Sequence, residues 1–224
     1  MELSIDTASD LASLALSREG VVLHDVSWQC ARNHTVELLP AIDRLLTGAG
    51  AARGDLAAVF VTTGPGMYTG LRVGIATAKG LARGLSLPLV GVGRLELDAF
   101  PHRGAADAVI AVHRAGRGDL AWASYADNPW RELTPPRLSK PQEFVEQLRL
   151  PILVVGEVDD GLSALLAGLK RVTVVQLSTS GRARALASLG WERLAAGAPS
   201  DPALLHPVYL RPPAIGPQQG GSGP

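Results

Sequence analysis

Short apolar runs, separated by glycine-rich or charged turns, fill the first hundred positions of the chain. In some segments the apolar residues recur every two positions, as in a strand, and in others about every 3.6 positions, as in a helix. The expected elements are strands at 3–7, 11–17 and 21–28, a helix at 34–46, a strand at 55–61, a helix at 71–83, a strand at 87–92 and a short helix at 94–100. This order predicts a complete β-β-β-α-β-α-β lobe with a parallel crossover.

The pattern is less regular in the second half of the chain. Strands are expected at 108–112, 121–125, 151–155 and 172–175, and helices at 141–149, 161–169 and 180–196. The stretch 128–139 contains three prolines and is expected to be an irregular connection. We therefore predict an N-terminal lobe at 1–103, a smaller C-terminal lobe at 104–211, and a disordered tail at 212–224 that is rich in Pro, Gly and Gln.

Two helices of the first lobe have unusual surfaces. A stripe of small residues, Gly70, Gly74, Ala78 and Ala82, recurs every four positions of the helix at 71–83. Since a glycine inside a helix costs about 1 kcal/mol relative to alanine, another backbone is expected to approach closely. That backbone can belong to the same chain or to a partner, and the sequence leaves both open. The helix at 34–46 has an apolar stripe too wide for one covering surface.

Local signals set the ends of these helices. Asn33 is a plausible N-cap for the helix at 34–46, and Gly84 stands where the helix at 71–83 needs a C-cap. Pro40 lies past the first turn, where it removes a hydrogen bond, so it is predicted to bend or interrupt its helix.

A glycine turn, Gly64-Pro65-Gly66, joins the central strand to the helix at 71–83. Backbone amides at such a helix start can hold a phosphate or a carboxylate. Neither a Gly-Lys-Ser/Thr sequence nor Gly-x-Gly-x-x-Gly is present, so the known nucleotide-binding loops do not match. Anion binding and a purely structural turn both remain open.

Composition excludes several classes of protein. Lysine plus arginine and aspartate plus glutamate number 21 each in the 224 residues, so no overall field favours nucleic acid or membrane, although a local basic patch is compatible with this balance. The single cysteine, Cys30, cannot form an internal disulfide. We find no signal peptide and no apolar run long enough to span a bilayer. The expectation is a cytoplasmic protein with no membrane partner.

Side chains for metal or nucleophilic catalysis are sparse. The five histidines are His24, His34, His102, His113 and His206. No two of them lie three to five residues apart, so we nominate no metal ligands. No Gly-x-Ser-x-Gly motif occurs, and Cys30 has no evident base. No catalytic residue is nominated.

Several motifs together resemble one known family. Thr63-Gly-Pro-Gly-Met-Tyr-Thr-Gly-Leu-Arg-Val-Gly74 is similar to the signature of the bacterial TsaB (YeaZ) family. Ile5-Asp6-Thr7-Ala8, the stretch His34–Pro40 and the stretch Pro207–Arg211 also resemble it, in the same order. The resemblance is dense from residue 3 to about 100 and thin from there to about 200. This chain differs from the family pattern in the loop His113–Arg117 and at Ala121. Contacts that the family makes through this loop are therefore in doubt here.

The resemblance implies an α/β protein with the actin-like ATPase fold and a reduced second lobe. It implies a non-catalytic subunit in the synthesis of N6-threonylcarbamoyladenosine in tRNA, which binds the catalytic subunit TsaD, works with the ATPase TsaE and contacts tRNA mainly through their complex. A homodimer is expected when TsaD is absent. No cofactor is required, and weak binding of ATP or ADP with magnesium stays open. TsaD relatives carry a histidine pair shortly after the strand that follows the glycine turn, and the matching stretch 91–98 here has none.

The same resemblance nominates residues and alternatives. The partner or dimer surface is expected on the two unusual helices, at His34, Leu38, Leu45, Gly70, Arg72, Val73, Gly74, Thr77, Ala78 and Leu81. The nucleotide candidates are Asp6, Thr7, Gly64 and Gly66. The main alternative function is an ATP-dependent carbamoyl or phosphoryl transferase that uses Asp6 and the glycine turn. A metallopeptidase is the third possible function, and it is disfavoured because the histidine pair is missing.

Overall fold

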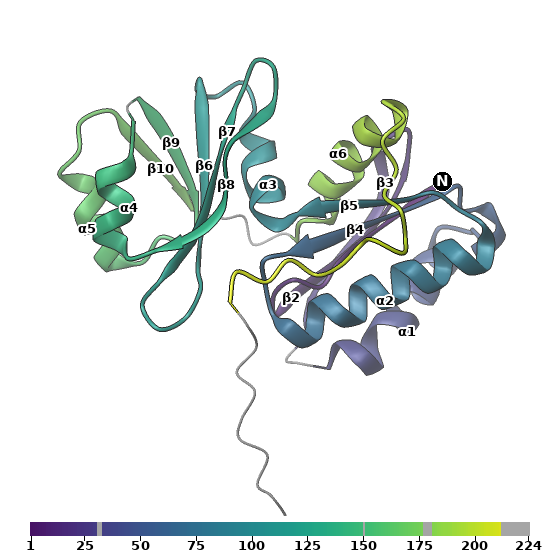
Figure 1. The fold of residues 1–224 in the computed structure, drawn as a ribbon. Coiled ribbons are helices and arrows are strands. Elements are labelled where there is room, and N and C mark those ends of the chain that lie inside the picture. Colours follow the sequence, from purple (N-terminus) through teal and green to yellow (C-terminus); the bar gives the residue numbers. More distant parts are fainter. Residues whose placement is uncertain (31–32, 150, 177–180, 212–224) are drawn as a thin grey trace, which may run out of the picture.

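Two mixed five-stranded sheets organise the chain, one in each lobe (Figure 1). The computed structural model describes residues 1–30, 33–149, 151–176 and 181–211. The first sheet has the order β3-β2-β1-β4-β5, with β1 (Glu2–Asp6), β2 (Leu11–Arg18), β3 (Val21–Gln29), β4 (Ala58–Gly64) and β5 (Leu89–Gly93). The antiparallel β1–β2–β3 meander and the parallel β1–β4–β5 side agree with the predicted order of elements.

Helices cover both faces of the first sheet because successive side chains of each strand point to opposite faces. On one face, Ile5 and Val61 pack with α1 (His34–Gly48) and α2 (Tyr68–Leu85) in a single core. On the other face, Phe60 and Val92 pack against α6 (Ala183–Ala195). The apolar residues of β4 therefore alternate between two cores, Val59 and Val61 on one face and Ala58 and Phe60 on the other.

The second sheet has the order β10-β9-β6-β7-β8. Its strands are β6 (Ala108–Arg114), β7 (Leu120–Ala126), β8 (Arg131–Ser139), β9 (Ile152–Gly156) and β10 (Val172–Gln176). One face packs against α4 (Pro141–Gln147) and α5 (Asp160–Ala167). The other face packs against α3 (Arg94–Ala99), which joins the lobes together with the short 3-10 helix η2 (Phe100–His102). A second 3-10 turn, η1 (Arg53–Asp55), precedes β4.

Four local predictions were wrong. Residues 131–139 form β8 and not an irregular connection, because β8 lies at the edge of its sheet, where prolines are tolerated. The helix α1 is not interrupted at Pro40, and the Asn33 side chain makes no capping hydrogen bond. The helix α2 ends at Leu85, and its C-cap is Ser86, in the left-handed conformation with a φ of 54°, and not Gly84.

The predicted boundary of the second lobe at 211 was also wrong. The helix α6 packs on the first sheet, where the Ala183 amide donates to Ser13 Oγ at 3.1 Å. The chain then stays with the first lobe, and the Val208 amide donates to the Thr63 carbonyl at 2.7 Å. The first lobe is therefore closed by residues from the end of the chain. The predicted tail at 212–224 lies outside the described residues. No helix among the described residues is both long and apolar enough to cross a bilayer.

The small-residue stripe of α2 packs inside the chain. A Cβ atom at Gly74 would overlap Thr7 Oγ1, and one at Gly70 would overlap the Thr7 carbonyl oxygen. The Thr7 hydroxyl donates to the Gly70 carbonyl at 2.8 Å, which holds the turn after β1 against the helix. Ala78 is fully buried in the same core. Of the two alternatives left open by the sequence, close approach within one chain is the correct one.

This packing predicts opposite effects for two glycine substitutions in one helix. Gly74→Ala is expected to lower the free energy of unfolding by roughly 1–3 kcal/mol, because the new methyl group displaces Thr7. Gly80→Ala is the matched control, since a Cβ there meets nothing within 4 Å. It should raise the free energy of unfolding by about 0.5–1 kcal/mol. Urea unfolding measures both, and equal stability of the two variants would contradict the close contact.

Candidate functional site

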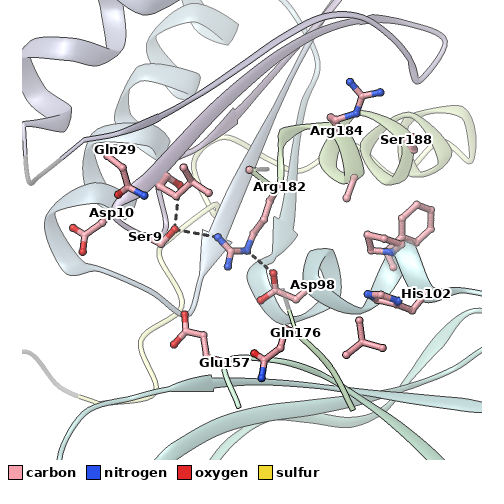
Figure 2. A pocket seen from close by; sticks show the side chains of 16 residues that line it. Ser9, Asp10, Gln29, Asp98, His102, Glu157, Gln176, Arg182, Arg184 and Ser188 are labelled. Carbon is pink, nitrogen blue, oxygen red and sulfur yellow. Dashed lines mark hydrogen bonds and ion pairs between the residues drawn. The ribbon is translucent and has the colours of Figure 1, made fainter. Parts of the chain in front are cut away.

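A cavity of about 810 Å³ lies between the lobes (Figure 2). The turn after β1 and the helix α6 line it from the first lobe, α3 and η2 from the connection, and the ends of β9 and β10 from the second lobe. Cavities of this size hold small molecules in many proteins. Its walls carry charges of both signs, and the central charge is the guanidinium of Arg182.

Arg182 immediately precedes α6 and points across the cavity wall. Its Nε donates to Asp98 Oδ1 at 2.6 Å, and its Nη1 donates to Ser9 Oγ at 3.1 Å. Nη1 also lies 3.5 Å from Asp6 Oδ2. Only 10% of the Arg182 side chain is exposed, and the two carboxylates are almost completely buried. One guanidinium therefore neutralises two buried acids that come from different elements.

The ion pairs continue into the second lobe. Arg94 Nε lies 3.7 Å from Asp98 Oδ2, and Arg94 Nη2 donates to Glu157 Oε1 at 2.6 Å. Glu157 directly follows β9, whereas Arg94 and Asp98 are one turn apart on α3. Asp6, Arg182, Asp98, Arg94 and Glu157 thus form a chain of alternating charges between the lobes, which we call the interlobe charge chain.

The surroundings shift the pKa values of this chain. Burial lowers the pKa of Arg94, and the nearby Arg182 lowers it further. Burial also opposes the charge of Arg182, but Asp98 and Asp6 hold its pKa above the ordinary value. Burial raises the pKa of Asp98, an effect that the two guanidinium groups oppose. Arg94 lowers the pKa of Glu157 against the effect of its partial burial. The arginines and acids therefore depend on one another for their charged states.

Two further ionisable groups are held neutral. Burial, followed by the nearby Arg94, lowers the pKa of His113 to about 4. Burial raises the pKa of the Cys30 thiol to about 11, so this cysteine is a poor nucleophile near neutral pH. Within the described ranges, no three His, Cys, Asp or Glu side chains are grouped so that they could hold a metal ion.

The four nucleotide candidates lie together, but internal contacts engage them. Asp6 Oδ1 accepts from the Ala8 amide at 3.1 Å, an Asx-type turn, while Oδ2 faces Arg182. The Thr7 hydroxyl is bonded to α2, and Gly66 packs against the Ala8 carbonyl oxygen. Gly64 is buried, with a φ of +107° that favours glycine. Contacts within the chain therefore account for all four residues, as expected if the glycine turn is purely structural.

The predicted partner surface divides into buried and accessible residues. The prediction of direct partner contacts was wrong for five residues, because all of them are buried within the chain: His34, Leu38, Gly70, Gly74 and Ala78. The reason is that α1 and α2 pack on each other and on the sheet, which uses these positions. The remaining candidates, Leu45, Val73, Thr77 and Leu81, are half-buried, and Arg72 is exposed on another side of α2.

Two aliphatic residues of α1 outside the nominated partner surface are also exposed. Val36 and Leu39 are 73% and 54% exposed. The stripe was read as wider than it is, and the buried face follows Leu38, Ile42 and Leu46. Large aliphatic side chains at this exposure are candidates for contact with another protein.

No local motif marked the interlobe charge chain. Its members are spread from Asp6 to Arg182, and the only sequence signal was the spacing of Arg94 and Asp98, four residues apart on a helix. Folding, and not spacing, brings the other three charges together. The fold also places Arg211 on the diverged loop at 113–117, where it donates to the carbonyl groups of Ala115 and Gly116.

Comparison with known sequences gives consistent relatives. The family model described as TsaD, tRNA N6-adenosine threonylcarbamoyltransferase, matches residues 26–188. The tRNA threonylcarbamoyladenosine biosynthesis protein TsaB of Bacillus subtilis is 31% identical over 218 residues, 93% of each chain. The protein of the same name from Escherichia coli is 38% identical over 125 residues, which are 55% of this chain and 54% of that protein.

Solved structures agree with these relatives. YeaZ from Pseudomonas aeruginosa superposes with a TM-score of 0.74 and 27% identity, over 92% of this chain and 99% of that chain. The ethanolamine utilization protein EutJ from Carboxydothermus hydrogenoformans shares the fold, with a TM-score of 0.51 and 14% identity over 83% of this chain and 88% of that one. The chain therefore belongs to the TsaB (YeaZ) family, within the wider group that the TsaD family model matches, and it has the actin-like ATPase fold.

Proposed function

We propose that this chain takes part in the synthesis of N6-threonylcarbamoyladenosine in tRNA as a subunit without catalytic residues of its own. The observation that carries the proposal is the match to the TsaB protein of Bacillus subtilis over 93% of both chains. In this proposal the chain binds and supports the catalytic subunit TsaD, TsaE supplies ATPase activity, and tRNA is contacted mainly through the complex. No cofactor is needed by this subunit.

The helices α1 and α2 supply the contact surface of the proposal. We call Val36 and Leu39 of α1, together with Val73, Thr77 and Leu81 of α2, the α1–α2 face; Leu45 lies nine residues after Val36, on the opposite side of α1, and is not part of it. Val36 and Leu39 are three residues apart, so they share one side of α1 and form its exposed apolar part. Burial of one such side chain in an interface contributes about 1.5–3 kcal/mol. In the absence of TsaD, the same face joins two copies of this chain.

The contacts of the Asp6 carboxylate favour a subunit that does not itself catalyse a reaction. In a transferase of this fold, we expect the carboxylate at the end of the first strand to face a metal-bound phosphate. Here the Arg182 guanidinium lies 3.5 Å from Asp6 Oδ2, and the other oxygen accepts from the backbone. A magnesium ion would have to compete with a buried cation that also holds Asp98. The main alternative, an ATP-dependent carbamoyl or phosphoryl transferase, is supported by the 810 Å³ cavity between the lobes.

The α1–α2 face predicts a loss of TsaD binding when charges replace its exposed aliphatic residues. Val36→Lys together with Leu39→Lys should raise the Kd for TsaD at least about tenfold, because two apolar contacts are lost. Val21→Lys with Leu23→Lys is the matched control, since these β3 residues are 67% and 45% exposed on a different element. Isothermal titration with TsaD from the same source measures both. Wild-type affinity in the α1 variant would contradict the surface.

Titration with ATP–magnesium separates the subunit from the transferase. We expect no heat of binding at micromolar nucleotide, because Arg182 already neutralises Asp6. The transferase alternative instead requires micromolar affinity that is abolished by Asp6→Ala. Asp10→Ala is the control, because Asp10 lines the same cavity without contacting Arg182 in the described structure. Micromolar binding that is lost in Asp6→Ala and kept in Asp10→Ala would overturn the non-catalytic proposal.

A further inference from the structure

The helix α2 has a basic side that neither the core nor the α1–α2 face uses. Arg72, Lys79 and Arg83 recur at i, i+7 and i+11, so they lie along one side of the helix over about 16 Å. Arg72 and Arg83 are exposed and Lys79 is partly exposed. The helix has three basic residues and no acidic residue. In a chain whose charges balance overall, this stripe is a local concentration of positive charge.

These cations are free to meet a ligand. Among the residues that the structure describes, no carboxylate lies within ion-pair distance of Arg72, Lys79 or Arg83. The only side-chain hydrogen bond found for Arg72 in that part of the chain runs from Nε to Tyr209 Oη, at 3.3 Å. By contrast, Arg182 and Arg94 each lie within ion-pair distance of two carboxylates. The basic stripe therefore has no carboxylate partner in the described part of the chain that would balance its charge.

Two tyrosines stand at the N-terminal end of the stripe. The rings of Tyr68 and Tyr209 stack with their centroids 5.0 Å apart and an angle of 30° between planes. The Arg72 guanidinium lies 4.1 Å from the centre of the Tyr68 ring, and Tyr68 is 37% exposed. These contacts hold the aromatic rings in place at the surface, so little side-chain entropy is lost when a planar group stacks on them.

The C-terminal segment forms the opposite wall of a groove beside the stripe. In Figure 1 the segment runs along α2 toward the second lobe, and it brings His206 and Tyr209 next to the helix. The groove has a volume of about 580 Å³ and is lined on the α2 side by Arg72, Ala76 and Lys79. The α2 wall thus offers two cations, Arg72 and Lys79, the other wall offers the aromatic ring of Tyr209, and the residues between them are largely apolar.

We propose that this groove contacts single-stranded RNA. The cations would neutralise successive phosphates, and a base would stack on the exposed part of Tyr68, the combination that single-stranded nucleic acids require. An acidic peptide would use the charges but not the aromatic pair. The choice of RNA rests on the proposed function, and it assigns to this subunit a direct contact with the tRNA substrate in addition to contacts made through the complex. We call Tyr68, Arg72, Lys79, Arg83, His206 and Tyr209 the α2 basic face.

The α2 basic face leaves the proposed TsaD contact available. Val73, Thr77 and Leu81 follow a different side of the helix, and Val73 and Leu81 pack against the core that α1 shares. One helix therefore presents a partner-binding side and an RNA-binding side at the same time. This arrangement lets both ligands be measured separately on the intact chain.

The test measures RNA affinity by fluorescence anisotropy with a labelled tRNA anticodon stem–loop. Arg72→Glu, Lys79→Glu and Arg83→Glu are combined in one variant. We expect its Kd to rise at least about tenfold, and the slope of log K against log salt to fall by about 2 to 3, since three phosphate contacts are lost. The control combines Arg18→Glu, Arg131→Glu and Lys170→Glu, which are exposed cations on other elements and give the same change in net charge. It should change the Kd less than about twofold.

A second variant tests the aromatic contact. Tyr68→Leu should weaken RNA binding about fivefold or more, with an unchanged salt slope, because a stacked base is lost and no charge is. Equal losses in the two triple variants would overturn the proposal, since only overall charge would then matter. Displacement of the RNA by polyglutamate with no effect of Tyr68→Leu would overturn it in favour of an acidic protein partner.

Titration with TsaD distinguishes this inference from the proposed function. The triple variant on the α2 basic face should bind TsaD with wild-type affinity while its RNA affinity falls. If the wild-type chain binds the RNA through this face but does not bind TsaD, the proposed function fails and the RNA contact stands. If it binds TsaD but shows no RNA affinity that depends on the α2 basic face, the RNA contact fails alone.

Discussion

The interlobe charge chain is the constraint on which the arrangement of the two lobes depends. An isolated buried charge is costly, and removal of one member of a buried pair typically destabilises a protein by about 3–5 kcal/mol. Asp6 and Arg182 belong to the first lobe, Arg94 and Asp98 to the connecting helix, and Glu157 to the second lobe. Since each charge needs its neighbours, a change in the angle between the lobes would leave buried charges unpaired. The chain therefore links lobe geometry to the electrostatics of the cavity.

The same chain changes what the actin-like fold can do in this protein. The cleft between the lobes is retained, with a volume of about 810 Å³, but its central acids are neutralised by arginines of the protein itself. The turn after β1 is fixed by α2, where the Thr7 hydroxyl bonds to Gly70. Asp6 and Thr7, which could contact a ligand in this fold, are here engaged by contacts within the first lobe. This leaves the outer sides of α1 and α2 as the surfaces with unused apolar and basic groups.

Much of the first lobe could be predicted because its signals are local. Alternating apolar residues marked β1 to β3, and the strand–turn–helix pattern marked β4 and α2, since each pattern reflects which side of one element is buried. The prediction was wrong where the outcome depended on a distant segment. The strand β8 forms because β7 is available to pair with it, and α6 joins the first lobe because its Gly190 allows close contact with Phe60. Neither neighbour is visible in the local pattern.

The sequence by itself determined the family, the fold class and the order of elements in the first lobe, because these follow from periodicity, turn residues and specific motifs. Only the tertiary structure decided how those residues are used. It showed that Gly74 packs on Thr7, that Asp6 is neutralised by Arg182, and that Tyr209 stacks on Tyr68 beside cations with no carboxylate partner in the described part of the chain. The physical reason is that packing and charge pairing depend on distances in space. Residues 176 and 141 positions apart become neighbours only when the sheets and helices have assembled.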